Sequence, residues 1–113
     1  MVRNAAFRRA ELAARRDWRA LEELDQGEGW DAARWEAAFQ PYFAEHPGIG
    51  TGADARGPDL WQLGEEGRLW RARLVLDDPA GFREWAIVMA VDLDASDRLG
   101  EAVLRPLAIE RAR

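Results

Sequence analysis

The sequence of 113 residues contains no cysteine and no lysine, and it has one histidine and one serine. The absence of cysteine excludes disulfide bonds and thiolate chemistry. One histidine, His46, cannot build a structural zinc site, which takes about four Cys or His ligands. A single serine, Ser96, gives little material for a nucleophilic triad. We therefore expect no catalytic residue, no metal and no cofactor.

Long apolar runs are also missing. No stretch approaches the ~20 residues that a membrane-spanning helix needs, so we expect no membrane partner. The first residues, MVRNAAFRRAEL, lack the apolar core of a secretory signal, and we expect a cytoplasmic protein. The length fits one domain.

Charge is unevenly distributed along the chain. The net charge of −5 argues against a general nucleic-acid binder. All sixteen basic residues are arginine, and six of them fall within residues 1–19, where only Glu11 and Asp17 oppose them. We interpret this basic start as the solvated face of a helix. A surface that binds RNA is the alternative.

The first half of the chain has helical periodicity. Residues 4–25 predict one helix, because apolar side chains recur there at three- and four-residue steps: Phe7, Ala10, Ala14, Trp18 and Leu21. A second helix begins near Asp31, which can cap it, and ends by Pro47. Pro41 lies inside its aromatic stripe and predicts a kink or a break.

The second half has the two-residue period of strands. We expect four strands, at 59–63, 68–76, 84–93 and 101–109, joined by turns at 64–67 and 77–81 and a polar loop at 94–100. Both faces of the third strand are apolar, so it should be central. Pro106 cannot donate to a sheet, so the last strand should lie at an edge or carry a bulge.

Short turns favour antiparallel neighbours. The predicted fold is therefore α+β, with two N-terminal helices, the second kinked near Pro41, packed on a four-stranded antiparallel meander. A single domain, 1–113, would have a helical half at 1–47, a glycine-rich connection at 48–58 and a sheet half at 59–110.

The stretch HPGIGTGADARGP, residues 46–58, is the most unusual part of the sequence. A nucleotide-binding loop has a strand before it and a helix after it, and here the order is reversed and no lysine is available. We expect a structural loop whose glycines supply positive φ angles, with Gly50, Thr51, Gly52 and Gly57 as its structural positions and a backbone anion nest as the alternative. We predict that Arg56 bonds a carboxylate across the fold, and that Asp54 and Arg56 pin the loop to the turn at Asp77 and Asp78.

Other residues have a structural and a functional interpretation. His46 follows a helix whose dipole would favour its cation, and Asp78 belongs to an ordinary Asp-Pro turn. Arg71 and Arg73 share one face of a strand. If Trp61 were exposed beside them, the three would form a stacking surface for bases or for a partner protein. The candidate binding residues are Asp54, Arg56, Trp61, Arg71, Arg73 and Asp78.

The sequence resembles the C-terminal segment of actinobacterial DEAD/DEAH-box RNA helicases that end in a domain of unknown function. The resemblance covers nearly the whole chain and is most specific in IGTGADARGP at 49–58 and DDPAG at 77–81. The chain departs from the family pattern at Pro47 and at 82–84. The resemblance implies a module that lies behind a helicase motor; the motor motifs themselves are absent here. It marks the following positions without giving them a catalytic role: Gly50, Thr51, Gly52, Asp54, Arg56, Gly57, Asp77, Asp78 and Trp85.

Three hypotheses for function follow. The first is a non-catalytic accessory module that binds a protein partner or RNA. The second is a small-ligand or enzymatic pocket between helices and sheet, with Asp54, Arg56, His46 or Asp78 at its mouth. The third is a homodimer formed through a face or an edge of the sheet.

Overall fold

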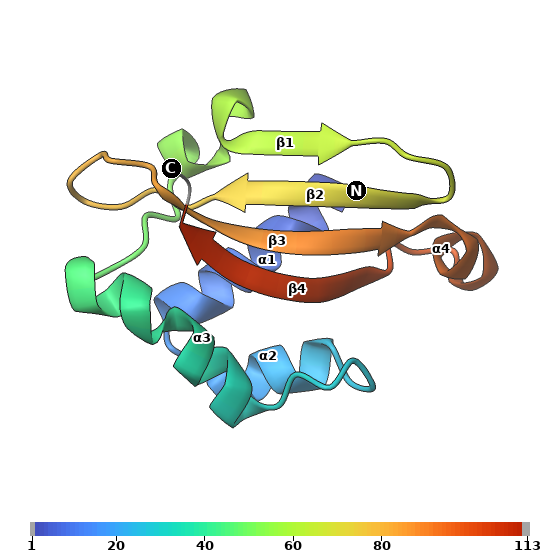
Figure 1. Cartoon of the computed structure of the whole chain (residues 1–113), viewed down its shortest axis with the longest axis horizontal. Helices are drawn as coiled ribbons and strands as arrows, with labels where there is room; N and C mark the ends of the chain where they lie inside the picture. Colours follow the sequence, from blue (N-terminus) through green and yellow to red (C-terminus); the bar gives the residue numbers. More distant parts are fainter. Residues whose placement is uncertain (1, 112–113) are drawn as a thin grey trace.

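Four antiparallel strands form one sheet, and helices pack on one of its faces (Figure 1). The computed structural model describes residues 2–111. The strands follow one another in space as they do in sequence: β1 (Trp61–Gly64), β2 (Leu69–Val75), β3 (Trp85–Asp92) and β4 (Leu104–Arg111). The predicted meander and the mixed α+β class are confirmed.

The first helical segment is two helices, where the sequence predicts one. α1 (Val2–Ala14) ends in a turn in which the Arg16 N–H donates to Ala13 and the Asp17 N–H donates to Leu12, each at 2.9 Å. This hydrogen-bond pattern is the Schellman cap of a helix, and it places Arg16 in the left-handed region with φ of 54°. Asp17 then caps α2 (Trp18–Leu24) by accepting from the Ala20 N–H at 3.2 Å.

The second predicted helix is α3 (Ala32–Glu45), and it begins as expected, with the Asp31 carboxylate accepting from the Arg34 N–H at 2.8 Å. The helix continues through Pro41, so the predicted break is wrong. The kink stays a prediction. Pro41 lies on the exposed side of the helix. The opposite side packs into the core through Trp35, Phe39 and Tyr42, and this packing stabilises the helix despite the proline.

The predicted polar loop at 94–100 is wrong, because a short helix, α4 (Leu93–Leu99), occupies most of it. Asp92 caps this helix by accepting from the Ala95 N–H at 3.0 Å, and Gly100 ends it with φ of 71°. Both are ordinary helix boundary signals. The sequence predicts a loop here because the segment is polar and too short to show a helical period.

The two predictions about individual strands are confirmed. β3 is paired on both sides, and seven of its eight residues are buried. β4 is an edge strand whose register shifts opposite Val88 and Met89, next to Pro106.

The main core lies between α1, α2, α3 and one face of the sheet. Aromatic side chains of α3 and aliphatic side chains of β3 belong to this core, together with one leucine of α2 and one that follows β2. The largest fully buried side chains of the core are Trp35, Phe39, Tyr42, Leu21, Leu76, Ile87, Met89 and Val91. The connection from helices to sheet contains two short 3-10 turns, η1 (Ala53–Arg56) and η2 (Pro58–Leu60). Within residues 2–111, no helix has the length and apolar character to cross a membrane.

Candidate interaction surface

One face of the sheet has no helix over it, and we call it the helix-free face (Figure 1). Side chains alternate between the two faces along each strand. The strand registers therefore place a connected set of side chains on the helix-free face, from β1 to β4: Gln62, Gly64, Arg71, Arg73, Val88, Ala90, Arg105 and Ala108.

The β3 side chains on this face, Val88 and Ala90, are small, so the middle of the face is shallowly recessed. Arg73 on β2 crosses them to reach Glu110 on β4, with 3.5 Å between Arg73 Nε and the Glu110 carboxylate. A larger residue at Val88 would block this path. Arg105 is also paired, with Glu28 at 2.6 Å and with Asp92 at 2.8 Å. Two of the three arginines of the helix-free face are thus neutralised by carboxylates.

Arg71 differs from these two. It is exposed, and within residues 2–111 it forms no ion pair. It lines an open depression of about 370 Å³ together with Gln62, Leu63, Gly64 and Arg73. Gly64 pairs with Arg71 across β1 and β2 and contributes no side chain, which leaves space beside the guanidinium. The depression therefore presents an unneutralised arginine, a second arginine and an amide.

Trp61 does not lie beside Arg71 and Arg73. It pairs with Leu74, and both side chains belong to the core face of the sheet, where Trp61 packs partly buried against the main core. Trp70 and Trp85 lie on the same core face. The stacking surface that the sequence suggested is not formed, because one residue of register decides which face Trp61 occupies.

The arginines of the first helical segment do not form one basic surface either. Arg9 is buried and bonds the Asp25 carboxylate through Nη2 at 2.5 Å. Arg3 donates to the carbonyl of Arg56, and Arg16 lies 3.9 Å over the ring of Phe43. Contacts within the protein therefore use several of the charges that the sequence seemed to offer to a partner.

Arg56 does pair with a carboxylate across the fold, as predicted, but the partner is different. Its guanidinium lies 3.6 Å from Glu11 of α1 and 4.2 Å from the ring centroid of Phe7. The predicted link from Asp54 and Arg56 to Asp77 and Asp78 is wrong. Asp54 is exposed and takes no part in the contact.

Gly50 makes the contact with the Asp77 turn instead. Its N–H donates to the Asp77 carbonyl at 2.7 Å. A Cβ at this position would lie 3.0 Å from Asp77 Cγ and 3.2 Å from the Asp77 carbonyl oxygen. The expectation that glycines of this loop supply positive φ angles is wrong, since none of Gly48, Gly50, Gly52 and Gly57 has one. At Gly50 the constraint is space, because an alanine would displace the Asp77 carboxylate and press on the Asp77 backbone. Thr51 and Gly52 are exposed, and a Cβ on Gly57 would meet the Asp59 carboxylate at 2.6 Å.

Asp78 is buried and holds the loop before β3. Its carboxylate accepts from the N–H of Phe82 at 2.9 Å and of Arg83 at 2.6 Å, and His46 Nδ1 lies 3.8 Å away. Burial by itself would raise the pKa of Asp78, but the hydrogen bonds from Arg83 and Phe82 and the nearby His46 together lower it. The arrangement orders a loop and offers no open position to a substrate.

Tyr42 completes this structural cluster. Its hydroxyl donates to the Gly48 carbonyl at 2.6 Å, and its ring packs against His46. Burial raises the pKa of Tyr42 well above its usual value, so the hydroxyl stays protonated. The start of the glycine-rich connection is thereby fixed to α3.

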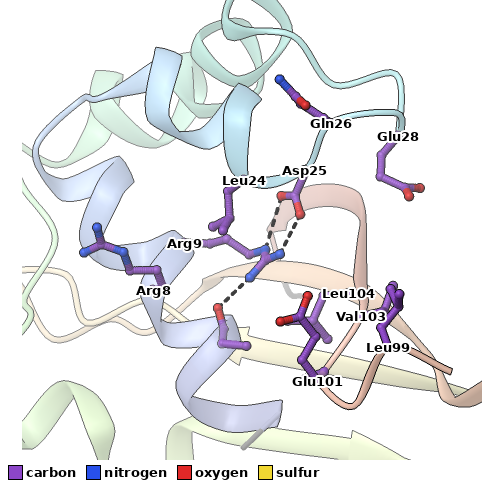
Figure 2. Close-up of a pocket in the computed structure, with 12 residues that line it drawn as sticks. Arg8, Arg9, Leu24, Asp25, Gln26, Glu28, Leu99, Glu101, Val103 and Leu104 are labelled. Atoms are coloured by element: carbon purple, nitrogen blue, oxygen red, sulfur yellow. Dashed lines mark hydrogen bonds and ion pairs between the residues drawn. The ribbon is translucent and has the colours of Figure 1, made fainter. Parts of the chain in front are cut away.

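A cleft of about 320 Å³ lies at the other end of the molecule, between α1, the segment after α2 and the segment before β4 (Figure 2). The Arg9–Asp25 pair lies on one wall, and Arg9 also donates to the Ala5 carbonyl at 2.6 Å. Burial raises the pKa of Asp25 despite the charge of Arg9. Sequence reasoning missed this cleft, because Leu24 on one wall is far in the chain from Glu101 and Leu104 on the other. The four residues expected at a pocket mouth, Asp54, Arg56, His46 and Asp78, do not line it.

Within the described residues, no group of three or more His, Asp or Glu side chains is placed to hold a metal ion. In the comparisons, no curated protein and no solved structure matches the chain. A family model does match, over residues 1–109, and its description is a domain of unknown function, DUF3516. The match spans almost the whole sequence, and the chain therefore belongs to the DUF3516 family.

Proposed function

We propose that the protein is a non-catalytic interaction module that binds an acidic segment of a partner protein through the helix-free face. The observation that carries the proposal is the depression beside β1, where Arg71 is exposed and without an ion pair in the described residues. Arginine binds carboxylates with two parallel, charge-assisted hydrogen bonds.

A protein partner is favoured over RNA by the character of this face. Sheets that bind single-stranded RNA stack bases on exposed aromatic rings. The helix-free face presents none, since Trp61, Trp70 and Trp85 belong to the core face. The net charge is −5, and on the helix-free face the ion pairs of Arg73 and Arg105 leave Arg71 as the arginine that could bind a phosphate.

The resemblance to helicase tails suggests where such a partner would be found. In that setting the module would dock on the helicase motor, or on a protein that the helicase recruits. This placement is part of the proposal and rests on the sequence resemblance alone.

The proposal is tested by titrating the isotope-labelled protein with a capped oligoglutamate peptide and following the backbone amides by NMR. We expect shift changes at 62–64 and 71–73, and binding that weakens between about 50 and 200 mM salt because exposed charges are screened. In the double variant Arg71→Glu/Arg73→Glu, binding should fall at least about tenfold.

The matched control is Arg15→Glu/Arg19→Glu, which changes the net charge equally on exposed residues of the helical half. This variant should keep the affinity. Equal losses in both variants would show a response to net charge alone and would contradict the proposal. Preferential binding of single-stranded oligouridylate, with shifts near 15 and 19, would favour the RNA alternative instead.

The cleft in Figure 2 favours a second candidate function, a small-ligand site, because its volume falls in the range of ligand pockets. Its walls combine the buried Arg9–Asp25 pair with Leu24, Val103 and Leu104. A fragment screen that follows the methyl groups of these three residues tests it. Fragments that shift these methyls, and lose affinity in Val103→Phe, would support the site; a screen without such shifts would remove it.

A further inference from the structure

The two edges of the sheet are protected differently. The β4 edge carries a bulge and contains Pro106, which has no N–H to offer a neighbouring strand. Its exposed C-terminal end also carries charge, in Glu110 and Arg111. These are the devices by which proteins prevent a strand from adding to an edge. At β4 such an addition is therefore blocked.

The β1 edge is short but lacks the proline, the bulge and the charged side chains of β4. Its four residues, Trp61–Gly64, include no proline and no charge, and their register with β2 is continuous. Alternate N–H and C=O groups of an edge strand point away from the sheet. Within residues 2–111, Gln62 and Leu63 make no backbone hydrogen bond on the side away from β2. In Figure 1, β1 lies at the outer border of the sheet.

Both faces next to this edge are suited to a strand of alternating character. On the core face, Trp61 and Leu63 are only partly buried, and apolar side chains of an added strand would cover them. On the helix-free face, Gly64 lies between the sheet edge and Arg71. Because glycine has no side chain, a side chain of an added strand could reach the Arg71 guanidinium over it. An added strand would lie about 10 Å from β2, a distance that a glutamate and an arginine side chain span together.

We propose that β1 is an open edge to which an extended segment of a partner protein adds as a fifth strand, with acidic residues on the helix-free face and apolar residues on the core face. An acidic side chain opposite Gly64 pairs with Arg71. This inference rests on the proposed function and specifies how the acidic segment binds: backbone hydrogen bonds supply affinity, and the alternation supplies specificity.

A second copy of the chain is a poorer occupant. Two β1 strands paired edge to edge would bring together residues 61–64 of each copy, and none of these is acidic. No carboxylate of residues 61–64 would then lie opposite Gly64. Charge complementarity therefore favours a different, acidic strand.

The test uses a capped heptapeptide, Val-Glu-Val-Glu-Val-Glu-Val, with the full chain. Three matched probes accompany it: the same peptide with alternate amides N-methylated, a peptide of the same composition with the glutamates adjacent, and a peptide with lysine in place of glutamate. We expect the alternating peptide alone to slow hydrogen exchange at 62–64. N-methylation and clustering should each weaken binding at least about tenfold, because the first removes edge hydrogen bonds and the second removes the alternation.

A variant of the protein adds an independent measurement. In Gly64→Val, the new Cβ meets the Arg71 carbonyl oxygen at an ordinary 3.7 Å, so the strand should tolerate the change. The valine side chain would block a glutamate of the added strand from reaching the Arg71 guanidinium. We expect at least about tenfold weaker binding of the alternating peptide, with unchanged thermal stability of the protein.

The outcomes separate this inference from the proposed function. The N-methylated and unmodified peptides could bind with equal affinity, and both could lose binding to the Arg71→Glu/Arg73→Glu variant. That result would overturn strand addition and leave the acidic-segment function intact. Binding of the lysine peptide equal to that of the glutamate peptide would overturn both. A concentration-dependent dimer with exchange protection at 62–64 and no peptide binding would also overturn the inference, in favour of a second copy.

Discussion

At the scale of single residues, the structure assigns most of the distinctive side chains to internal contacts. Arg9, Arg56 and Asp78 each meet a named partner within the chain, and Gly50 meets backbone. Arg71 is the exception on the helix-free face. A residue without an internal task is a better candidate for binding than one whose loss would first disturb the fold.

Gly50→Ala should destabilise the protein by about 1–3 kcal/mol, because the added Cβ would press on the Asp77 backbone and side chain. Gly48→Ala is the control: no atom lies within 4 Å of the position that a Cβ would take there, and its φ is not positive. That change should be neutral or stabilise by up to about 1 kcal/mol, since alanine restricts the unfolded chain. Urea unfolding of both variants measures the difference. Equal stabilities would show that the loop moves freely away from Asp77.

Asp78 gives a prediction about pH. Its pKa is lowered in the folded state from the ordinary 3.8, so the folded protein binds fewer protons there than the unfolded chain. Asp78 therefore stabilises the fold above about pH 4 and loses this effect as the pH falls through its folded pKa.

We expect Asp78→Asn to be less stable than the wild type by about 1–3 kcal/mol at pH 7, because one of two buried backbone donors loses its partner. The difference should shrink as the pH falls from about 4 through the folded pKa of Asp78, because the unfolded chain takes up the proton first and the folded carboxylate does so only at lower pH. Urea unfolding of both proteins at several pH values measures it. A difference that stays constant from neutral to acidic pH would contradict the assigned role.

At the scale of elements, the boundary between α1 and α2 shows how a local rule can be overridden. The apolar periodicity from Phe7 to Leu21 is continuous, so it predicts one helix. The chain turns at Arg16 nevertheless, and the turn lets α2 pack against α3, with Trp18 near Phe39. Tertiary packing outweighs periodicity here.

Arg16 occupies a capping position that glycine usually fills, since a side chain is strained at positive φ. Its side chain compensates by lying over Phe43 and by donating to the Pro47 carbonyl at 3.2 Å. Arg16→Ala keeps the strain and loses both contacts, whereas Arg16→Gly loses the contacts and removes the strain. The glycine variant should therefore be more stable than the alanine variant by about 1 kcal/mol, measured by thermal or urea unfolding. The reverse order would show that residue 16 leaves the left-handed region in the variants.

At the scale of the whole molecule, the protein has two layers, helices and sheet, and the sheet has one face outside them. Val91 and Val88 are both buried on β3 but face opposite sides. Val91 belongs to the main core, while Val88 lies on the helix-free face, close to the Arg73–Glu110 pair.

Val91→Ala should therefore destabilise the protein more than Val88→Ala, although both remove the same two methyl groups. We expect about 2–3 kcal/mol for Val91, where a cavity would form, and about 1 kcal/mol or less for Val88, where solvent and Arg73 can fill the space. Denaturant unfolding provides the two values. A loss at Val88 as large as at Val91 would contradict the prediction and show that the neighbours of Val88 leave a cavity there as well.

Much of the fold could be predicted because its signals are local. The two-residue alternation of 68–76 and the double apolar character of 84–93 predict strands, and Asp31 and Pro106 mark a helix start and an irregular edge. The candidate site was less accessible. Arg71 and Arg73 could be placed together on one face, but their relation to Trp61 depended on pairing between strands. The identity of Arg56's partner depended on a contact between residues distant in sequence.

The sequence by itself determined the class of fold, the order of its strands and the absence of thiol chemistry, because these follow from periodicity, turn residues and composition. Only the tertiary structure decided which arginines remain available. Ion pairs join Arg73 to Glu110, Arg9 to Asp25 and Arg56 to Glu11, and none of these pairs is near in sequence. The physical reason is that packing sets the distance between charges, and it is packing that leaves Arg71 without an ion pair in the described residues, beside Gly64 of the edge strand β1.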